Sequence, residues 1–268
     1  MATVHPTAIL GERITLGEGV IIGPHAIIED DVVVGDGCRI GPGTFIGRLS
    51  EIGRDNEIGM SVQIGGDPQI LGWRPVDSRV VIGSHNVIRE FASIHRAKEP
   101  GEATSIGNHC YLMGTSHVAH DCVIHDHVVL CNGALVAGHV EVGDHAFISG
   151  NCAIHQFVRV GRYVMMQGLT AVSKNIAPFT LVDQTNTIRG LNRIGLRRSG
   201  IPPENRQAIK EAYRVIFRSA RPLHESLAIV ESSPMCDEVR EMVEFIRASK
   251  RGICLSDRSA AEEEDGEG

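Results

Sequence analysis

The chain carries an aliphatic residue at every sixth position, with very few exceptions, from Val4 to Val172. The first run of these positions is Val4, Leu10, Leu16, Ile22, Ile28, Val34, Ile40, Ile46, Ile52, Ile58 and Ile64. A longer run extends from Ile106 to Val172. A period of six matches neither the helical period of about 3.6 residues nor the plain alternation of a long strand. It is typical of a short strand and a turn, repeated along the chain.

A small residue usually stands four positions after each aliphatic residue, as at Cys38, Cys110, Cys122 and Cys152. This position precedes the next aliphatic residue by two, and residues two apart in a strand point to the same face. Each unit therefore turns one large and one small side chain inward, with Gly, Asp and Asn at the corners. The pattern predicts a mainly β fold, a parallel β-helix of about nine to ten three-sided coils.

The repeat divides the chain into parts. We expect residues 1–190 to form the β-helix, with loops near 65–81 and 95–105, where turn-forming residues interrupt the pattern. Residues 191–255 are expected to form a C-terminal helical domain that caps the open end of the prism. Residues 256–268 are acidic and lack aromatic side chains, and we expect them to be disordered.

The helical expectation rests on apolar spacing after Pro203, a residue suited to a first helical turn. Ile209, Ala212 and Ile216 begin a stripe with helical spacing, and two later stripes lead us to expect three short helices in all. Residues 175–200 are read as a linker.

Composition narrows the classes of function. The net charge is -7, and residues 257–268 contribute -5 of it through six acidic residues and one Arg. The remainder is close to neutral, which argues against a nucleic-acid partner. The seven Cys show no paired CxxC spacing, so we expect reduced core residues of a cytoplasmic protein. Neither a signal peptide nor an apolar run of the roughly 18 residues of a membrane span is apparent, so stable membrane insertion is not expected.

The repeat also sorts the thirteen His. Five fall three residues after an aliphatic position, where a turn is expected: His25, His85, His109, His127 and His145. His109, His127 and His145 are spaced by one coil, so they should stack along one edge. We read these residues as plain corner residues rather than a metal ladder.

The other histidines of interest occupy outward positions on neighbouring coils. They are His117, His120, His139 and His155, accompanied by Asp121 and Gln156. None is needed for the core. A row of outward imidazoles with a carboxylate beside His120 suits general base chemistry. The residues alone leave a metal site and a neutral surface open as alternatives.

Three segments make a resemblance specific. They are 112–122 (LMGTSHVAHDC), 137–139 (AGH) and 153–157 (AIHQF), and they resemble the UDP-N-acetylglucosamine O-acyltransferases of lipid A biosynthesis. The resemblance extends over essentially 4–252, including the helical cap. It implies a left-handed parallel β-helix, a cytoplasmic homotrimer, and transfer of an acyl group, typically (R)-3-hydroxyacyl, from acyl carrier protein to the 3-hydroxyl of the sugar nucleotide.

The resemblance also implies residue roles. His120 would be the general base, Asp121 would orient it, and the Gly138 N–H would stabilise the oxyanion. Substrate contacts would come from His117, His139, His155 and Gln156, nucleotide contacts from Asn192 and Arg198, and an acceptor contact from the loop at Gln69. Gly168 falls where family members set acyl-chain length. No cofactor and no metal are implied.

Two departures concern the acceptor. Ile70 and Gly72 stand where the family loop commonly has Asp and Lys, and Ile194 replaces a Glu of some members. They leave open whether the acceptor is UDP-N-acetylglucosamine or a 3-amino variant. A run of basic residues near the cap could dock the acidic acyl carrier protein.

Three alternatives remain at this point. The first is an enzyme like the later N-acyltransferase of the pathway, and the second is a metal-dependent lyase of the γ-carbonic-anhydrase type. The third is a non-catalytic paralogue that binds acyl carrier protein.

Overall fold

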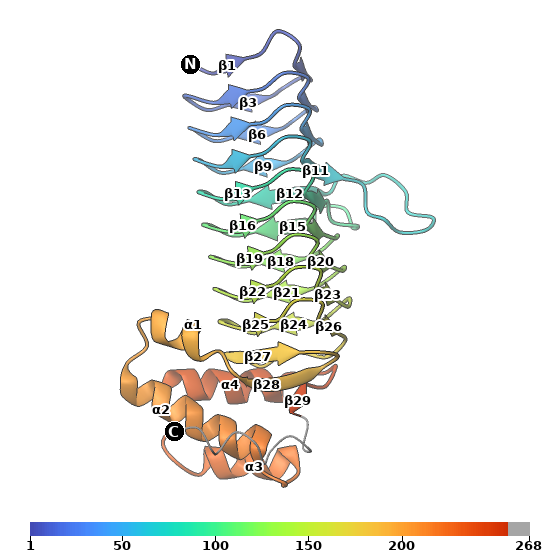
Figure 1. Ribbon diagram of the computed structural model, residues 1–268. Helices are drawn as coiled ribbons and strands as arrows, with labels where there is room; N and C mark the ends of the chain where they lie inside the picture. The colour runs from blue at the N-terminus through green and yellow to red at the C-terminus, as the bar shows by residue number, and fades with distance from the viewer. Residues whose placement is uncertain (257–268) are drawn as a thin grey trace.

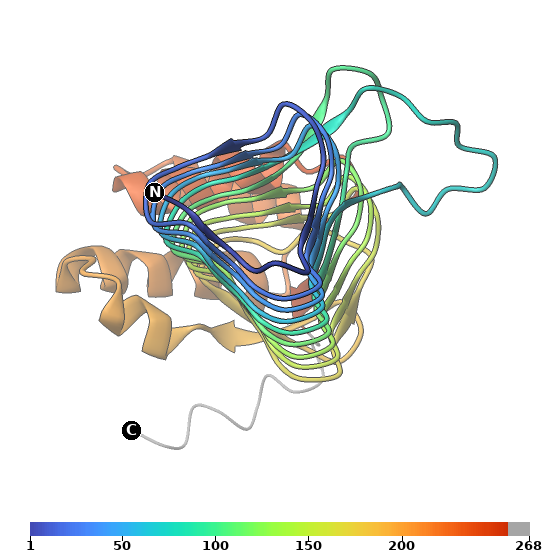
Figure 2. The ribbon, with the colours of Figure 1, turned by 90° about the horizontal axis from the view of Figure 1, so that it is seen from above.

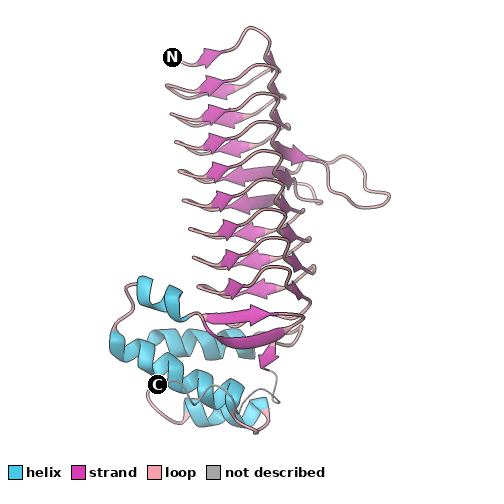
Figure 3. Cartoon of the chain, viewed as in Figure 1, coloured by secondary structure: helices cyan, strands magenta, loops and turns pink. Residues whose placement is uncertain are grey.

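The computed structural model describes residues 1–256 as a three-sided parallel β-helix with helices at its C-terminal end (Figures 1 and 3). Seen along its axis, the chain winds as a triangle whose sides are the three sheets (Figure 2). Successive strands of one sheet pair in register, for example Thr3 with Ile21, one coil of 18 residues apart. The expected β-helix with a helical cap is therefore confirmed.

Sheet A is 12-stranded and includes the strands that extend the prism toward the cap. Its strands are β1 (Thr3–Val4), β4 (Ile21–Ile22), β7 (Arg39–Ile40), β10 (Glu57–Ile58), β13 (Val87–Ile88), β16 (Tyr111–Leu112), β19 (Val129–Leu130), β22 (Phe147–Ile148), β25 (Met165–Met166), β27 (Thr180–Asp183), β28 (Thr187–Leu191) and β29 (Leu255–Ser256).

Sheet B is nine-stranded, and its outer face carries the candidate site described below. Its strands are β2 (Ile9–Leu10), β5 (Ile27–Ile28), β8 (Phe45–Ile46), β11 (Gln63–Gly66), β14 (Ser93–His95), β17 (His117–Val118), β20 (Leu135–Val136), β23 (Ala153–Ile154) and β26 (Ala171–Val172).

Sheet C is eight-stranded and faces the last helix of the cap. Its strands are β3 (Thr15–Leu16), β6 (Val33–Val34), β9 (Glu51–Ile52), β12 (Arg79–Ile82), β15 (Ala103–Ile106), β18 (Val123–Ile124), β21 (Glu141–Val142) and β24 (Arg159–Val160).

The aliphatic residue of each repeat fills the prism. Ile64, Ile88 and Val118 have no exposed surface, whereas Val4 and Leu10, in the first coil, are 36% and 39% exposed. These two side chains also point inward, but no preceding coil covers them. Each fully buried aliphatic side chain stabilises the fold by about 1.5–3 kcal/mol, so stability accumulates coil by coil.

The small inward residues also donate hydrogen bonds to carbonyl groups at the turns. The Cys122 thiol donates to the Ala137 carbonyl of the next coil at 3.1 Å, and the Cys110 thiol donates likewise to His125 at 3.0 Å. Cys38, Cys110, Cys122 and Cys152 are all free and buried, as the repeat predicts. Burial raises the pKa of Cys122 to about 12 and that of Cys110 to about 11.

The corner between sheets C and A carries a column of stacked rings. His109 stacks on His127 at 4.9 Å and His127 on His145 at 4.5 Å, so the predicted stacking is confirmed. His85 precedes this column and Tyr163 follows it. Ring stacking along this column accounts for the presence of histidines at these corners.

Two connections leave the prism between sheets B and C. Residues 67–78 join β11 to β12 and project far from the axis, and residues 96–102 join β14 to β15 (Figures 1 and 2). They contact each other, because the Trp73 indole N–H donates to the Lys98 carbonyl at 3.0 Å and the Gly101 N–H to the Asp77 carbonyl at 2.8 Å.

The C-terminal helices close the lower end of the prism (Figure 3). They are α1 (Arg193–Arg198), α2 (Pro203–Tyr213), a π-helical turn (Arg214–Arg218), α3 (Leu223–Glu231) and α4 (Asp237–Arg247). None of the helices within residues 1–256 is both long enough and apolar enough to cross a membrane.

The expectation of a linker at 175–200 is wrong. β27 pairs in parallel with β25 and antiparallel with β28, and α1 follows directly. The six-residue period stops before this segment, so the sequence pattern gave no signal for these strands. The acidic stretch that we expected to be disordered lies, except for Ser256 in β29, outside the described residues.

Candidate active site

A groove with a volume of about 690 Å³ follows the outer face of sheet B and the corner after it. It crosses several coils, from β17 to β26. Its lining residues are Gln69, His117, Ala119, His120, Leu135, Ala137, Gly138, Ala153, Ile154, His155, Ala171, Val172, Ser173 and Thr185. Five of the residues singled out from the sequence therefore meet here, although they are far apart along the chain.

His120 and Asp121 form a hydrogen-bonded pair at the edge of this groove. The His120 Nδ1 and Asp121 Oδ2 atoms are 2.6 Å apart, and the two side chains are only 14% and 12% exposed. An ionised carboxylate can only accept, so this bond requires a proton on Nδ1. Nε2 is then left as the basic nitrogen, which is the tautomer that general base catalysis needs.

The backbone and both carboxylate oxygens of Asp121 are held in place. The residue adopts a left-handed φ of 60°, which Asp tolerates better than most residues, and its N–H donates to Thr104 Oγ1 at 2.8 Å. The Lys98 N–H donates to Oδ1 at 3.2 Å, while Oδ2 faces His120. The orientation of the carboxylate is thus set by the 96–102 connection and the strand after it.

Gly138 lies directly against the His120 ring. A Cβ atom at this position would stand 2.5 Å from His120 Cε1 and 2.7 Å from Nε2, so only glycine allows this contact. Among residues 1–256, no group accepts a hydrogen bond from the Gly138 N–H. A free backbone N–H beside a basic imidazole nitrogen can stabilise negative charge that develops during the reaction.

His117 lines the groove from β17. Its Nδ1 is 2.9 Å from Ser93 Oγ on the neighbouring strand, and its ring meets His95 edge to face at 5.1 Å. Burial, reinforced by His95 and His120, lowers the pKa of His117 to about 4. His117 is therefore a neutral hydrogen-bonding group near pH 7.

His139 lies beside the pair on the next coil, outside the groove lining. Its Nε2 is 3.5 Å from Asp121 Oδ2, its ring meets His120 edge to face at 5.2 Å, and it stacks on Phe157 at 4.5 Å. Burial lowers the pKa of His139 despite the nearby carboxylate. Its contacts show that it packs against the His120–Asp121 pair.

His120, Asp121 and His139 also offer three potential metal-ligand atoms within 4.8 Å of one another. Two ligands of a tetrahedral zinc site lie about 3.4 Å apart, given metal–ligand distances of about 2.0–2.2 Å. The 2.6 Å between His120 Nδ1 and Asp121 Oδ2 is a hydrogen-bond distance instead. As they stand, these side chains do not fit a metal ion.

The remaining predicted site residues lie apart from the pair. His155 lines the groove and accepts a hydrogen bond from Arg251 at 3.3 Å, whereas its neighbour Gln156 does not line it. Gly168 lies on the corner between sheets A and B, where an added Cβ would have Gly150 O, at 3.5 Å, as its nearest neighbour.

Asn192 and Arg198 bound α1, near the opposite corner of the prism. The Asn192 side chain accepts from the Gly195 N–H and donates to the Tyr163 carbonyl, at 2.8 and 2.9 Å. Within this chain, Asn192 thus caps a helix, and Arg198 lies exposed at that helix's C-terminal end.

Sequence reasoning missed the residues that support the site. Ser93, Lys98, Thr104 and Arg251 contact His117, Asp121 or His155 from elsewhere in the chain. Two of them had a signal in the repeat: Ser93 occupies the outward position of the strand that precedes that of His117 in sheet B, and Thr104 the small inward position two residues before Ile106.

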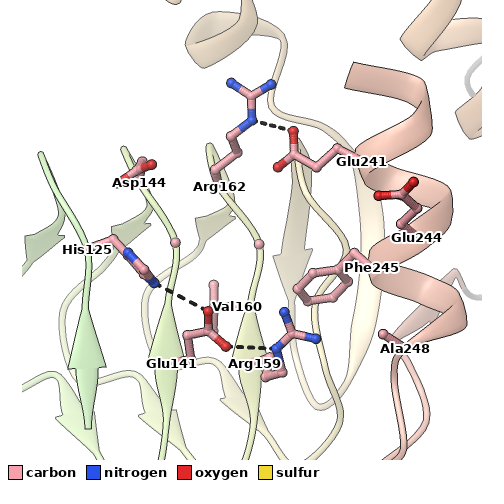
Figure 4. Close-up of a pocket in the computed structure, with 12 residues that line it drawn as sticks. His125, Glu141, Asp144, Arg159, Val160, Arg162, Glu241, Glu244, Phe245 and Ala248 are labelled. Atoms are coloured by element: carbon pink, nitrogen blue, oxygen red, sulfur yellow. Dashed lines mark hydrogen bonds and ion pairs between the residues drawn. The ribbon is translucent and has the colours of Figure 1, made fainter. Parts of the chain in front are cut away.

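A second hollow, of about 350 Å³, lies between sheet C and α4 (Figure 4). Its charged groups pair with one another: Arg159 with Glu141 at 2.8 Å, and Arg162 with Glu241 of α4 at 2.6 Å. The Arg159 guanidinium also lies over the Phe245 ring at 4.8 Å. These contacts attach the cap to the prism.

Comparison with known proteins agrees with this geometry. Residues 175–254 match the family model described as UDP-N-acetylglucosamine O-acyltransferase, domain 2. Residues 13–48 and 103–138 match the bacterial transferase hexapeptide model.

Two relatives are named acyl-[acyl-carrier-protein]–UDP-N-acetylglucosamine O-acyltransferase. The one from Gloeothece citriformis is 39% identical over 184 residues, which is 68% of this chain and 67% of the relative. The one from Nautilia profundicola is 39% identical over 189 residues, covering 70% and 73% of the two chains.

Solved structures extend the similarity to nearly the whole chain. The UDP-N-acetylglucosamine acyltransferase from Campylobacter jejuni superimposes with a TM-score of 0.90 at 34% identity, covering 95% of this chain and 100% of that one. The enzyme from Bacteroides fragilis gives 0.84 at 38% identity, with coverage of 94% and 97%. The fold is the left-handed parallel β-helix of these enzymes. The chain belongs to the UDP-N-acetylglucosamine O-acyltransferase family.

Proposed function

We infer that this protein is an O-acyltransferase that moves an acyl group from acyl carrier protein to the 3-hydroxyl of UDP-N-acetylglucosamine, the first step of lipid A biosynthesis. The observation that carries the chemistry is the His120–Asp121 pair beside the free Gly138 N–H. We assign a (R)-3-hydroxyacyl group as the donor's cargo. The N-acyltransferase reading is not favoured, because the relatives are named as O-acyltransferases.

The proposed reaction uses these three residues in turn. His120 Nε2 takes the proton of the sugar hydroxyl as its oxygen attacks the thioester carbonyl of the donor. The Gly138 N–H donates to the oxyanion of the tetrahedral intermediate, a contribution of about 3–4 kcal/mol in other enzymes. As the carbon–sulfur bond breaks, the imidazolium returns the proton to the thiolate. Asp121 stabilises that imidazolium and keeps Nδ1 protonated.

The rest of the groove suits the two substrates. We propose that His117, His155 and Gln69 contact the acceptor, with His139 and Gln156 at its margin. The exposed face of sheet B continues from His117 through Leu135 and Ala153 to Ala171, which supplies a mostly apolar surface for the acyl chain. Gly168 remains our proposed determinant of chain length.

We propose that the enzyme acts as a cytoplasmic homotrimer. The cap residues Asn192 and Arg198 lie near the corner opposite sheet B, so they cannot reach the groove of their own chain. In a trimer with sites between prisms, a neighbouring copy could bring them to the nucleotide. Basic residues of the cap would then also face the acidic acyl carrier protein: Arg189, Arg193, Arg197, Arg206, Lys210, Arg214 and Arg221.

The test is mass spectrometry of the products formed by purified protein. The reactions combine a panel of acyl carrier protein thioesters with UDP-N-acetylglucosamine or its 3-amino analogue. We expect O-acylated UDP-N-acetylglucosamine, and a loss of roughly 10²–10⁴-fold in turnover for His120→Ala. His25→Ala, at an exposed corner away from the groove, serves as the control. No acylated product with any pair, or stoichiometric zinc in the purified protein, would contradict the proposal.

A further inference from the structure

A chain of hydrogen bonds connects the projecting 67–78 loop to the His120–Asp121 pair. The Trp73 indole N–H donates to the Lys98 carbonyl at 3.0 Å, and the Lys98 N–H donates to Asp121 Oδ1 at 3.2 Å. Asp121 Oδ2 in turn faces His120 Nδ1 at 2.6 Å. Lys98 is therefore fixed on one side by the indole and presents its N–H to the carboxylate on the other.

This arrangement determines how the carboxylate is turned. Each oxygen of Asp121 has one hydrogen-bond partner, the Lys98 N–H on Oδ1 and His120 on Oδ2, and His139 Nε2 lies farther from Oδ2, at 3.5 Å. If Lys98 moves, Oδ1 loses its donor and rotation of the carboxylate is less restricted. The bond to His120 is the one that such rotation misaligns, and hydrogen bonds weaken steeply with misalignment.

Trp73 is well suited to hold Lys98. It comes from a loop that also contacts the 96–102 connection at its base and rim, through Ser78 to the Ala97 carbonyl, Asp67 to Arg96, and the backbone bond between Gly101 and Asp77. The same loop brings Gln69 to the groove.

We propose that Trp73 is a positioning residue, which acts through Lys98 to orient Asp121 and hence the general base His120. The proposal rests on the proposed acyltransferase function of the groove. It assigns the 67–78 loop a role in turnover besides any contact with the acceptor.

Trp73→Phe keeps an aromatic ring but removes the indole N–H donor together with part of the ring system. Losing one neutral hydrogen bond of this kind predicts a fall of roughly two- to tenfold in kcat, with the KM of both substrates within about twofold of wild type. Arg74→Ala is the matched control, because Arg74 is exposed in the same loop and has no hydrogen bond or ion pair within residues 1–256. It should leave kcat unchanged.

A double-mutant cycle separates positioning from general loop stability. In an Asp121→Ala background the Trp73→Phe change should lower kcat by less than about twofold, because the carboxylate it orients is gone. An equal fold-loss in both backgrounds, or no loss in either, would overturn the proposal. Thermal unfolding of all variants checks that they fold.

A second readout needs no activity. The chain has one Trp, so ¹⁵N-Trp labelling gives a single indole N–H signal. Asp121→Ala should shift that signal and speed its hydrogen exchange, although Asp121 does not touch the indole. A shifted signal in a protein that transfers no acyl group would refute the proposed function and leave the hydrogen-bond chain intact. An active enzyme with an unmoved signal would refute the chain alone.

Discussion

Gly138→Ala should disable the enzyme through steric contact with the base. The added Cβ would stand 2.5 Å from His120 Cε1, whereas carbon atoms in contact normally keep about 3.5–4.0 Å. The ring must therefore retreat by about 1 Å. His120 Nδ1 is held at 2.6 Å from Asp121, so a retreat of this size lengthens the bond toward the limit of a hydrogen bond.

The expected loss follows from the displacement. Misplacing a reacting group by about 1 Å costs roughly 10²-fold, and losing general base catalysis altogether costs up to about 10⁴-fold. We therefore expect kcat to fall by about 10²–10⁴-fold, equivalent to about 3–5 kcal/mol in the activation barrier. Gly138 does not have a positive φ, so alanine is compatible with its backbone and the fold should persist.

The assay is steady-state acyl transfer, with circular dichroism and thermal unfolding measured in parallel. Gly150→Ala is the matched control, because Gly150 also lies two residues after a repeat aliphatic. Its added Cβ would meet Asn132 O as its nearest neighbour, at 3.4 Å, an ordinary contact distance. We expect its kcat to stay within about twofold of wild type. A folded Gly138→Ala enzyme with kcat within about threefold of wild type would refute the contact as part of the catalytic geometry.

Two further predictions concern the groups around His120. Asp121→Asn keeps the shape of the side chain but allows an amide N–H to face His120 Nδ1, so the ring would favour the wrong tautomer. We expect kcat to fall by about 10³–10⁴-fold with little change in unfolding temperature. A loss in kcat below tenfold would contradict this role of Asp121. His117 has a folded pKa of about 4 against an ordinary value of 6.5, so the unfolded chain binds its proton more readily and stability is lost as pH falls from 6.5 toward 4. After allowance for partial exposure, this loss in the free energy of unfolding is about 1–3 kcal/mol. Urea unfolding at pH 7.5 and 4.5, at one protein concentration, should show a smaller pH dependence of that free energy in His117→Gln than in wild type.

The repeat made much of the fold predictable because it records burial directly. Because an aliphatic residue recurs at every sixth position, the side of each short strand that carries it must face the interior. The same periodicity placed Cys122 inside and His109, His127 and His145 in one column, and the structure agrees. The segment 175–200 was misread because β27 and β28 follow no six-residue period, and their pairing depends on sheet A and the cap beneath it.

The candidate site was predictable in part. The outward positions of His117, His120 and His155 could be read from the repeat, since register in a β-helix converts sequence spacing into spatial neighbourhood. Their roles came from resemblance rather than from spacing. Asn192 shows the limit, because within one chain it caps a helix far from the groove, and its predicted nucleotide contact depends on a neighbouring subunit.

By itself, then, the sequence determined the coil, its inward residues and the set of outward imidazoles, because these follow from local periodicity and are repeated many times. The resemblance named His120 as the base, and only the tertiary structure supplies the geometry that supports this proposed role. That assignment draws on the 2.6 Å contact of His120 with Asp121, the glycine backbone against its ring, and two contacts that fix Asp121: the Lys98 N–H donates to its carboxylate, and Thr104 Oγ1 accepts from its backbone N–H. The Lys98 and Thr104 contacts come from a connection that interrupts the repeat and from the strand after it. The repeat accounts for the buried position of Thr104 but not for the contact of either residue with Asp121.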